Sequence, residues 1–121
     1  MANGEVFSAG GFEIYDHVAH AVNVVQSIPG APVTIITPAA GKRLLVHTLL
    51  ARSVNAQNTT VSFQLAGITG ADGANTFWEL YCGTDGTSRN ASVDVIGAVN
   101  ASLTAASTSQ AAIVDIVYKE V

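Results

Sequence analysis

The sequence predicts an all-β chain, a single antiparallel β-sandwich or jelly roll with a flexible N-terminal arm. Two observations lead to this prediction. Segments in which apolar and polar residues alternate with a period of two recur along the chain, about six or seven in all, separated at short intervals by turn residues. No long segment has a convincing helical period, and no repeat of fixed length suggests a propeller or a solenoid.

The clearest strand signals lie in the first half of the chain. Residues 33–37 are expected to form one strand, residues 44–51 the next and residues 59–65 a third. Pro38, which has no amide donor, and Gly41, which tolerates positive φ, suit the corner between the first two. We expect these three strands to pair in order as a meander.

The strand at 44–51 is apolar on both faces, which predicts a covered strand in the middle of a sheet. A period of two divides it into Leu44, Val46, Thr48 and Leu50 on one face and Leu45, His47, Leu49 and Ala51 on the other. The strand at 59–65 is instead half-buried. Its predicted inner face consists of Thr59, Val61, Phe63 and Leu65.

Weaker patterns predict the remaining elements. The expected strands cover residues 21–28, 76–82, 91–103 and 112–121. Glycine-rich and polar loops are expected at 66–75 and 83–90, and a Ser/Thr/Ala linker at 104–110. Gly97 is interpreted as a bulge inside its strand.

Two of these strands have predicted core residues. In the aromatic strand, Trp78 shares a face with Leu80 and Cys82, so we expect Trp78 to be a core anchor. The closing strand is expected to direct Ala112, Val114, Ile116 and Tyr118 inward.

Length and composition limit the function. A chain of 121 residues is expected to form one domain, with an arm at residues 1–20 and the β-sandwich at residues 21–121. Charged residues make up only 12%, against about 25% in typical domains, which suggests a surface covered by a partner or by further copies. A monomer with a surface rich in alanine, serine and threonine is the alternative. The net charge of −4 argues against nucleic-acid binding.

The N-terminal residues resemble neither a signal peptide nor a membrane anchor. Residues 1–11 contain three glycines and few large apolar side chains, so they are expected to form the mobile part of the arm. No segment approaches the roughly 20 apolar residues that a membrane helix needs, so no membrane association is expected.

No catalytic constellation stands out, and we expect no enzymatic activity, no cofactor and no metal. His17 and His20 have the spacing of two metal ligands on a helix, but no third ligand follows at a convincing spacing. The acidic residues of the loops and strands lack the dense oxygen ligands of a calcium site. They are Asp72, Asp85, Asp94 and Asp115, of which Asp72 is interpreted as a turn residue.

Three other residues have a structural interpretation that outweighs a catalytic one. His47 is expected to be partly buried and hydrogen-bonded, because it lies among leucines. Cys82, the only cysteine, is expected to be a small buried residue. Glu79 has no recognisable second carboxylate for glycoside hydrolysis. The glycine loop 67–73 lacks the lysine and the following helix of a phosphate cradle.

The order of these segments has a counterpart in known proteins. The chain has an opening strand, a Gly41-Lys42 corner, an apolar strand, the segment 60–63 and a closing strand at 112–121 that carries Tyr118. This layout resembles small β-sandwich virion proteins of tailed bacteriophages, and the resemblance covers residues 33–121.

The resemblance implies a function for the chain. It would be a non-enzymatic capsid decoration or cement protein that binds the outer surface of the phage head and stabilises contacts between major capsid subunits. The expected partner is the major capsid protein, and the expected state is a homo-oligomer, a trimer. The protein would be made in the bacterial cytoplasm and would reside on the virion.

Two other classes stay open. A carbohydrate-binding or host-surface-adhesion β-sandwich, such as a head fibre or tail accessory protein, would need exposed aromatic rings, for which Tyr15, Trp78 and Tyr81 are the candidates. A buried Trp78 would remove the main support for this class. A small hydrolase on a β-scaffold would need a pair of carboxylates or histidines that converge in a cleft.

Overall fold

The computed structural model describes residues 19–25, 32–54, 58–73, 75–84, 89–108 and 111–121. Within these ranges the chain forms eight strands and no helix. The strands are β1 (Ala19–Val25), β2 (Val33–Ile36), β3 (Leu44–Ser53), β4 (Thr59–Gln64), β5 (Thr76–Cys82), β6 (Arg89–Ile96), β7 (Leu103–Ser107) and β8 (Ala112–Glu120). The described residues accordingly contain no helix that could span a membrane.

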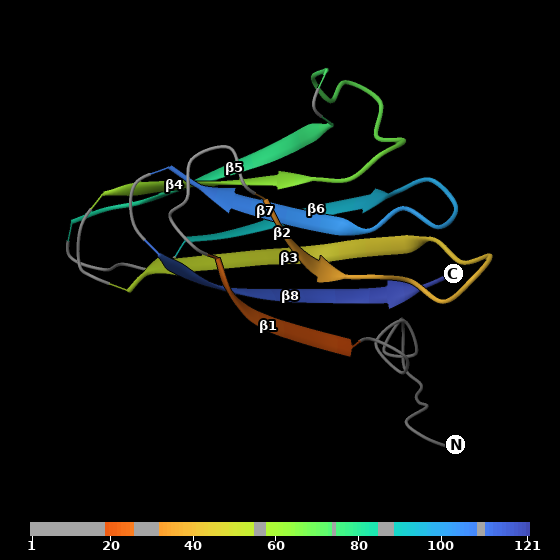
Figure 1. The fold of residues 1–121 in the computed structure, drawn as a ribbon, viewed down its shortest axis with the longest axis horizontal. Coiled ribbons are helices and arrows are strands. Elements are labelled where there is room, and N and C mark those ends of the chain that lie inside the picture. The colour runs from red at the N-terminus through yellow and green to blue at the C-terminus, as the bar shows by residue number, and fades with distance from the viewer. Residues whose placement is uncertain (1–18, 26–31, 55–57, 74, 85–88, 109–110) are drawn as a thin grey trace, which may run out of the picture.

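The strands form two four-stranded sheets that pack face to face (Figure 1). Sheet A has the order β1-β8-β3-β6 and sheet B the order β2-β7-β4-β5, with every described pair antiparallel. The first strand pairs with the last, the second with the seventh, the third with the sixth and the fourth with the fifth. This is a long antiparallel hairpin rolled into two sheets, the topology of a jelly roll. The predicted all-β sandwich is confirmed.

The expected meander is wrong. β2 and β4 belong to sheet B and β3 belongs to sheet A, so none of these three strands pairs with another. The turn signals of the sequence are real, since Gly41 has a φ of 81° and the Lys42 amide donates to the Ala39 carbonyl at 3.0 Å. A turn residue specifies where the chain reverses, but it does not specify whether the next strand pairs or crosses to the other sheet.

A bulge in β3 corrects the predicted division of its two faces. The strand lies in the middle of sheet A as expected, but its register shifts between Val46 and Thr48 against both neighbours. Against β8, His47 is an extra residue of β3, which moves the following side chains to the opposite face. Against β6 the extra residue lies in β6, between Ser92 and Val95. The buried residues are Leu44 and Val46 before the bulge and Leu49, Ala51 and Ser53 after it.

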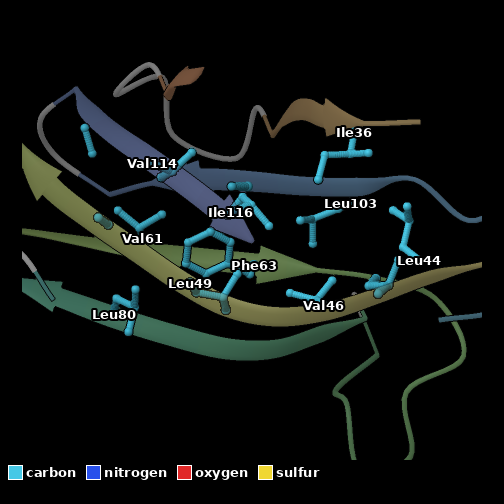
Figure 2. Packing of buried hydrophobic residues seen from close by; sticks show 14 of the residues in the cluster. Ile36, Leu44, Val46, Leu49, Val61, Phe63, Leu80, Leu103, Val114 and Ile116 are labelled. Atoms are coloured by element: carbon cyan, nitrogen blue, oxygen red, sulfur yellow. The ribbon is translucent and has the colours of Figure 1, made fainter. Parts of the chain in front are cut away.

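The core lies between the two sheets and draws on both (Figure 2). Phe63 of β4 is its largest fully buried side chain. The predicted inner face of β4 is confirmed, because Thr59, Val61, Phe63 and Leu65 are all buried. In β8, Ala112, Val114 and Ile116 are buried and Tyr118 packs against the core, as predicted.

Two expectations for residues 91–110 are wrong. β6 ends at Ile96, and Gly97 is not a bulge but a buried position, where a Cβ atom would lie 2.7 Å from Leu65 Cγ. The expected linker contains β7, whose inward residues are Leu103, Ala105 and Ser107. Alanine and serine are weak strand formers, so their pattern gives little signal, but β7 lies between β2 and β4 inside sheet B and buries one face.

The first strand begins at Ala19, within the arm predicted for residues 1–20. β1 spans Ala19–Val25 instead of residues 21–28, and it pairs along its whole length with β8 at the edge of sheet A. The rest of the predicted arm, residues 1–18, lies outside the described residues.

Candidate functional site

Trp78 is exposed, which corrects its predicted role as a core anchor. It lies opposite the buried Phe63 in the ladder, yet 40% of its surface is accessible. The register shifts at this point, so that Gln64 pairs with Thr76 and Phe77 is an extra residue in β5. Phe77 packs against the core in place of Trp78. Because β5 is the outermost strand of sheet B, the indole extends beyond the packed centre.

An open hollow of about 390 Å³ lies beside this indole. Its lining residues are Asp72, Thr76, Phe77, Trp78 and Glu79. Successive side chains of a strand point to opposite faces, so a hollow lined by both Trp78 and Glu79 follows the outer edge of β5. We refer to these five residues as the β5 hollow.

The loop before β5 holds one wall of the hollow in place. Asp72 Oδ1 accepts a hydrogen bond of 2.8 Å from the Thr76 amide, and the Asp72 amide donates to the Thr76 carbonyl at 3.1 Å. The Asn75 amide donates to the Asp72 carbonyl at 2.8 Å, with Asn75 in the left-handed region at a φ of 65°. The expected turn role of Asp72 is confirmed, and the turn orients its carboxylate.

The second carboxylate of the hollow is held from the neighbouring strand. Ser62 lies directly opposite Glu79 in the ladder, and Ser62 Oγ donates to Glu79 Oε2 at 3.3 Å. Tyr81, two residues further along β5, is 51% exposed but does not line the hollow. The strand therefore presents two exposed aromatic rings, of which one belongs to a site with acidic walls.

His47 has the structural role that its position predicts. The side chain is half-buried at the bulge of β3, and Nδ1 lies 2.7 Å from Oδ1 of Asp94 on β6. Asp94 has a φ of 49°, so the backbone is bent on both sides of this contact. The pair joins the two strands where their register shifts.

The other predicted candidates do not assemble into a reactive centre in the described part of the chain. Cys82 is fully buried in the core, as expected. His20 lies in β1 opposite Val117, whereas His17 and Asp85 lie outside the described residues, as does Tyr15. Among the described histidines, cysteines and acidic residues, no group of three could hold a metal ion.

A second surface of interest is the outer face of sheet A. Among the side chains of β3, β6 and β8 that the structure describes, five aliphatic ones lie on it, four half-buried and Ile96 at 43% exposure. They are Leu45, Leu50, Ile96, Ile113 and Val117. None of them packs against the core, whereas neighbours of the opposite phase such as Val95 and Tyr118 do. A sheet face in contact with water usually carries mostly polar residues. The outer face of sheet A carries more aliphatic side chains than such a face normally does.

No protein-family model and no curated protein matches this chain. The resemblance to phage virion proteins therefore stays a prediction.

The sequence predicts individual residues of the β5 hollow but not that they lie together. The sequence marks Asp72, Glu79 and Trp78 as candidates, but for separate roles. Their convergence depends on the extra residue at Phe77 and on the edge position of β5, neither of which is encoded by spacing.

Proposed function

We propose that this chain is a non-enzymatic capsid decoration protein of a bacteriophage, which binds the outer surface of the head and stabilises contacts between major capsid subunits. The observation that carries the proposal is the outer face of sheet A. A structural protein needs apolar surface with which to bind its partner, and it does not need a catalytic site. The outer face of sheet A supplies such a surface on a rigid sheet.

The aliphatic residues are distributed over three strands of the sheet, β3, β6 and β8. Leu45 lies opposite Ile96 on one side and Lys119 on the other, and Val117 lies opposite Thr48. In the next rows Leu50 lies opposite Asp115, and Ile113 lies opposite Arg52. Each row thus combines an aliphatic side chain with a polar one, and this mixture resembles a non-obligate protein interface more than a core.

The size of the face indicates how tightly one copy would bind. Full burial of an aliphatic side chain contributes about 1.5–3 kcal/mol, so completing the burial of these five contributes roughly 1 kcal/mol each. The total of about 5 kcal/mol is close to the lower end of the cost of association, about 4–15 kcal/mol. A single copy would therefore bind weakly. A trimer that engages several capsid sites together would bind far more tightly through avidity.

The test uses expanded capsids of the phage that encodes this chain, prepared without it. Addition of the protein should raise the temperature at which the capsids release their DNA. The Ile96→Asp variant should lose this effect, because a charge on the outer face of sheet A opposes docking. The matched control is Val99→Asp, which changes a side chain of similar exposure, 49%, in the turn after β6. Equal protection by both variants, or no protection by the wild type, would refute the proposal.

A second function is favoured by one specific observation. Trp78 is exposed in a hollow that two acidic residues also line, which is the arrangement expected of a carbohydrate-binding or host-surface-adhesion module. Such a module could belong to a head fibre or a tail accessory protein. The two functions use different surfaces of the jelly roll, since Trp78 lies on sheet B and the aliphatic face on sheet A.

A further inference from the structure

The β5 hollow has the dimensions of a small-molecule site. Its volume of about 390 Å³ lies within the range of roughly 300–1,000 Å³ that is common for ligand pockets. It combines an aromatic wall with a few polar groups, the usual composition of such sites. It is open rather than enclosed, so a ligand would keep one side in water.

The aromatic wall is held firmly. Phe77 packs against the core immediately before Trp78 in the chain, and the backbone on the other side is paired with β4. The indole is therefore attached to a fixed strand, and it has only two side-chain torsions to lose on binding. A rigid, exposed indole offers a flat apolar surface at low entropic cost. The C–H face of a pyranose ring is a flat apolar surface that matches it.

The polar walls accept hydrogen bonds and repel anions. Two acidic residues, Asp72 and Glu79, and the hydroxyl-bearing Thr76 are among the lining residues, and none of the described lining residues is basic. Ionised carboxylates make hydrogen bonds roughly twice as strong as neutral acceptors do. A ligand for this site must therefore bring several hydroxyl donors and no negative charge.

Both carboxylates are oriented before a ligand arrives. The Thr76 amide holds Asp72 at 2.8 Å and the Ser62 hydroxyl holds Glu79 at 3.3 Å. A backbone amide thus holds one carboxylate, and a side chain of the neighbouring strand holds the other. Because both carboxylates are already ordered, less conformational entropy is lost when a ligand binds.

We infer that the β5 hollow binds an uncharged pyranose sugar, with one ring face stacked on Trp78 and hydroxyl groups donating to Asp72 and Glu79. The inference rests on the second function proposed above and names its ligand class and its site. An organic cation is the competing ligand. Cation recognition by aromatic rings improves when several faces surround the charge, but Phe77 is packed against the core and leaves Trp78 as the exposed ring of the hollow.

The first experiment uses Trp78 as its own reporter, because it is the only tryptophan of the chain. Neutral oligosaccharides that contain glucose, galactose, mannose or N-acetylglucosamine are titrated while indole fluorescence is recorded. A saturable spectral shift is expected for at least one of them, with a Kd on the order of 1 mM, as suits a ligand of this size in an open site. Sialylated and uronic-acid oligosaccharides should give no shift. Choline and lysine are titrated in parallel.

Variants then locate the site by ligand-observed NMR, which needs no tryptophan. Trp78→Ala should weaken binding at least tenfold, and Glu79→Gln should weaken it several-fold. The matched control is Tyr81→Ala, which removes an exposed ring from the same strand outside the hollow and should bind as the wild type does. Circular dichroism and thermal unfolding of each variant establish that it is folded.

The possible failures can be distinguished. If no neutral sugar binds, or if choline or lysine binds instead, both the carbohydrate function and this inference are refuted. If a sugar binds but Trp78→Ala binds it as well as the wild type, the function stands and the site inference is overturned. Sugar binding that is lost equally in folded Tyr81→Ala would also overturn the assignment to this hollow.

Discussion

The contact between Gly97 and Leu65 gives the sharpest test of how the two sheets pack. Gly97 follows β6 of sheet A, and Leu65 follows β4 of sheet B. A Cβ atom at Gly97 would lie 2.7, 2.8 and 2.9 Å from Cγ, Cδ1 and Cδ2 of Leu65. Leu65 is itself only 1% exposed, so it has little room to move away. The Gly97→Ala substitution therefore tests whether this interior is as tightly packed as these distances indicate.

The expected loss of stability follows from two opposing terms. Overpacking of a filled core costs about 1–3 kcal/mol. Replacing glycine by alanine restricts the unfolded chain, which returns about 0.4–1 kcal/mol. The net loss is therefore about 1–2 kcal/mol in the free energy of unfolding. With a urea m-value of about 1–3 kcal/mol/M, the midpoint should fall by roughly 1 M at unchanged m.

A double-mutant cycle and a control separate this clash from other effects of the substitution. Leu65→Ala alone should cost about 2–5 kcal/mol, but in its background Gly97→Ala should be nearly neutral, which gives a coupling of at least about 1 kcal/mol. Gly73→Ala is the control, because a Cβ atom there meets nothing within 4 Å and no positive φ is required. Urea unfolding followed by far-UV circular dichroism measures all four variants. Wild-type stability of Gly97→Ala, or the same loss with and without Leu65, would refute the packing argument.

Four further predictions follow from burial and from the proposed assembly. Phe63→Ala should lower the free energy of unfolding by about 3–5 kcal/mol, because Phe63 is the largest fully buried side chain; a loss below 1 kcal/mol in urea titrations would contradict its central position. The Cys82 thiol should react with a chromogenic disulfide reagent only under unfolding conditions, and fast labelling of the native protein would be inconsistent with a fully buried sulfur. Acrylamide should quench Trp78 fluorescence strongly in the native state. Weak quenching that increases on unfolding would indicate that the indole is buried in the core. Light scattering after size exclusion should give about three times the chain mass of 12.4 kDa across a dilution series, and a persistent monomer would count against a preformed trimer.

Local patterns predicted most of the strands because alternation follows directly from burial of one face. β4 and β8 were recognised with their inner residues, since large apolar side chains such as Val61 and Ile116 contrast with polar neighbours. β7 was missed because Ala105 and Ser107 are small, and small residues give alternation little contrast. What places them in the core is the position of β7 inside sheet B, between β2 and β4, where its inward face is covered by sheet A; this is a tertiary property.

A bulge and an edge position account for the errors at the proposed sites. One extra residue at His47 reverses the faces of β3 relative to β8, and the place of β5 at the edge of sheet B leaves Trp78 exposed although it has the phase of the buried Leu80 and Cys82. A bulge is set by the register of the partner strands, so a single strand read alone cannot reveal it. The pairing of β1 with β8 and of β3 with β6 likewise joins residues far apart in the chain, and no turn signal encodes such pairings.

If the protein is a capsid decoration protein, as proposed, the outer face of sheet A attaches it to the phage head. A cryo-electron microscopy reconstruction of expanded capsids saturated with the protein would show which face meets the shell. We predict density on the outer surface at the contacts between major capsid subunits, with Leu45, Ile96 and Val117 facing the shell. Absence of added density, or attachment through sheet B with the outer face of sheet A open to solvent, would refute the proposed attachment.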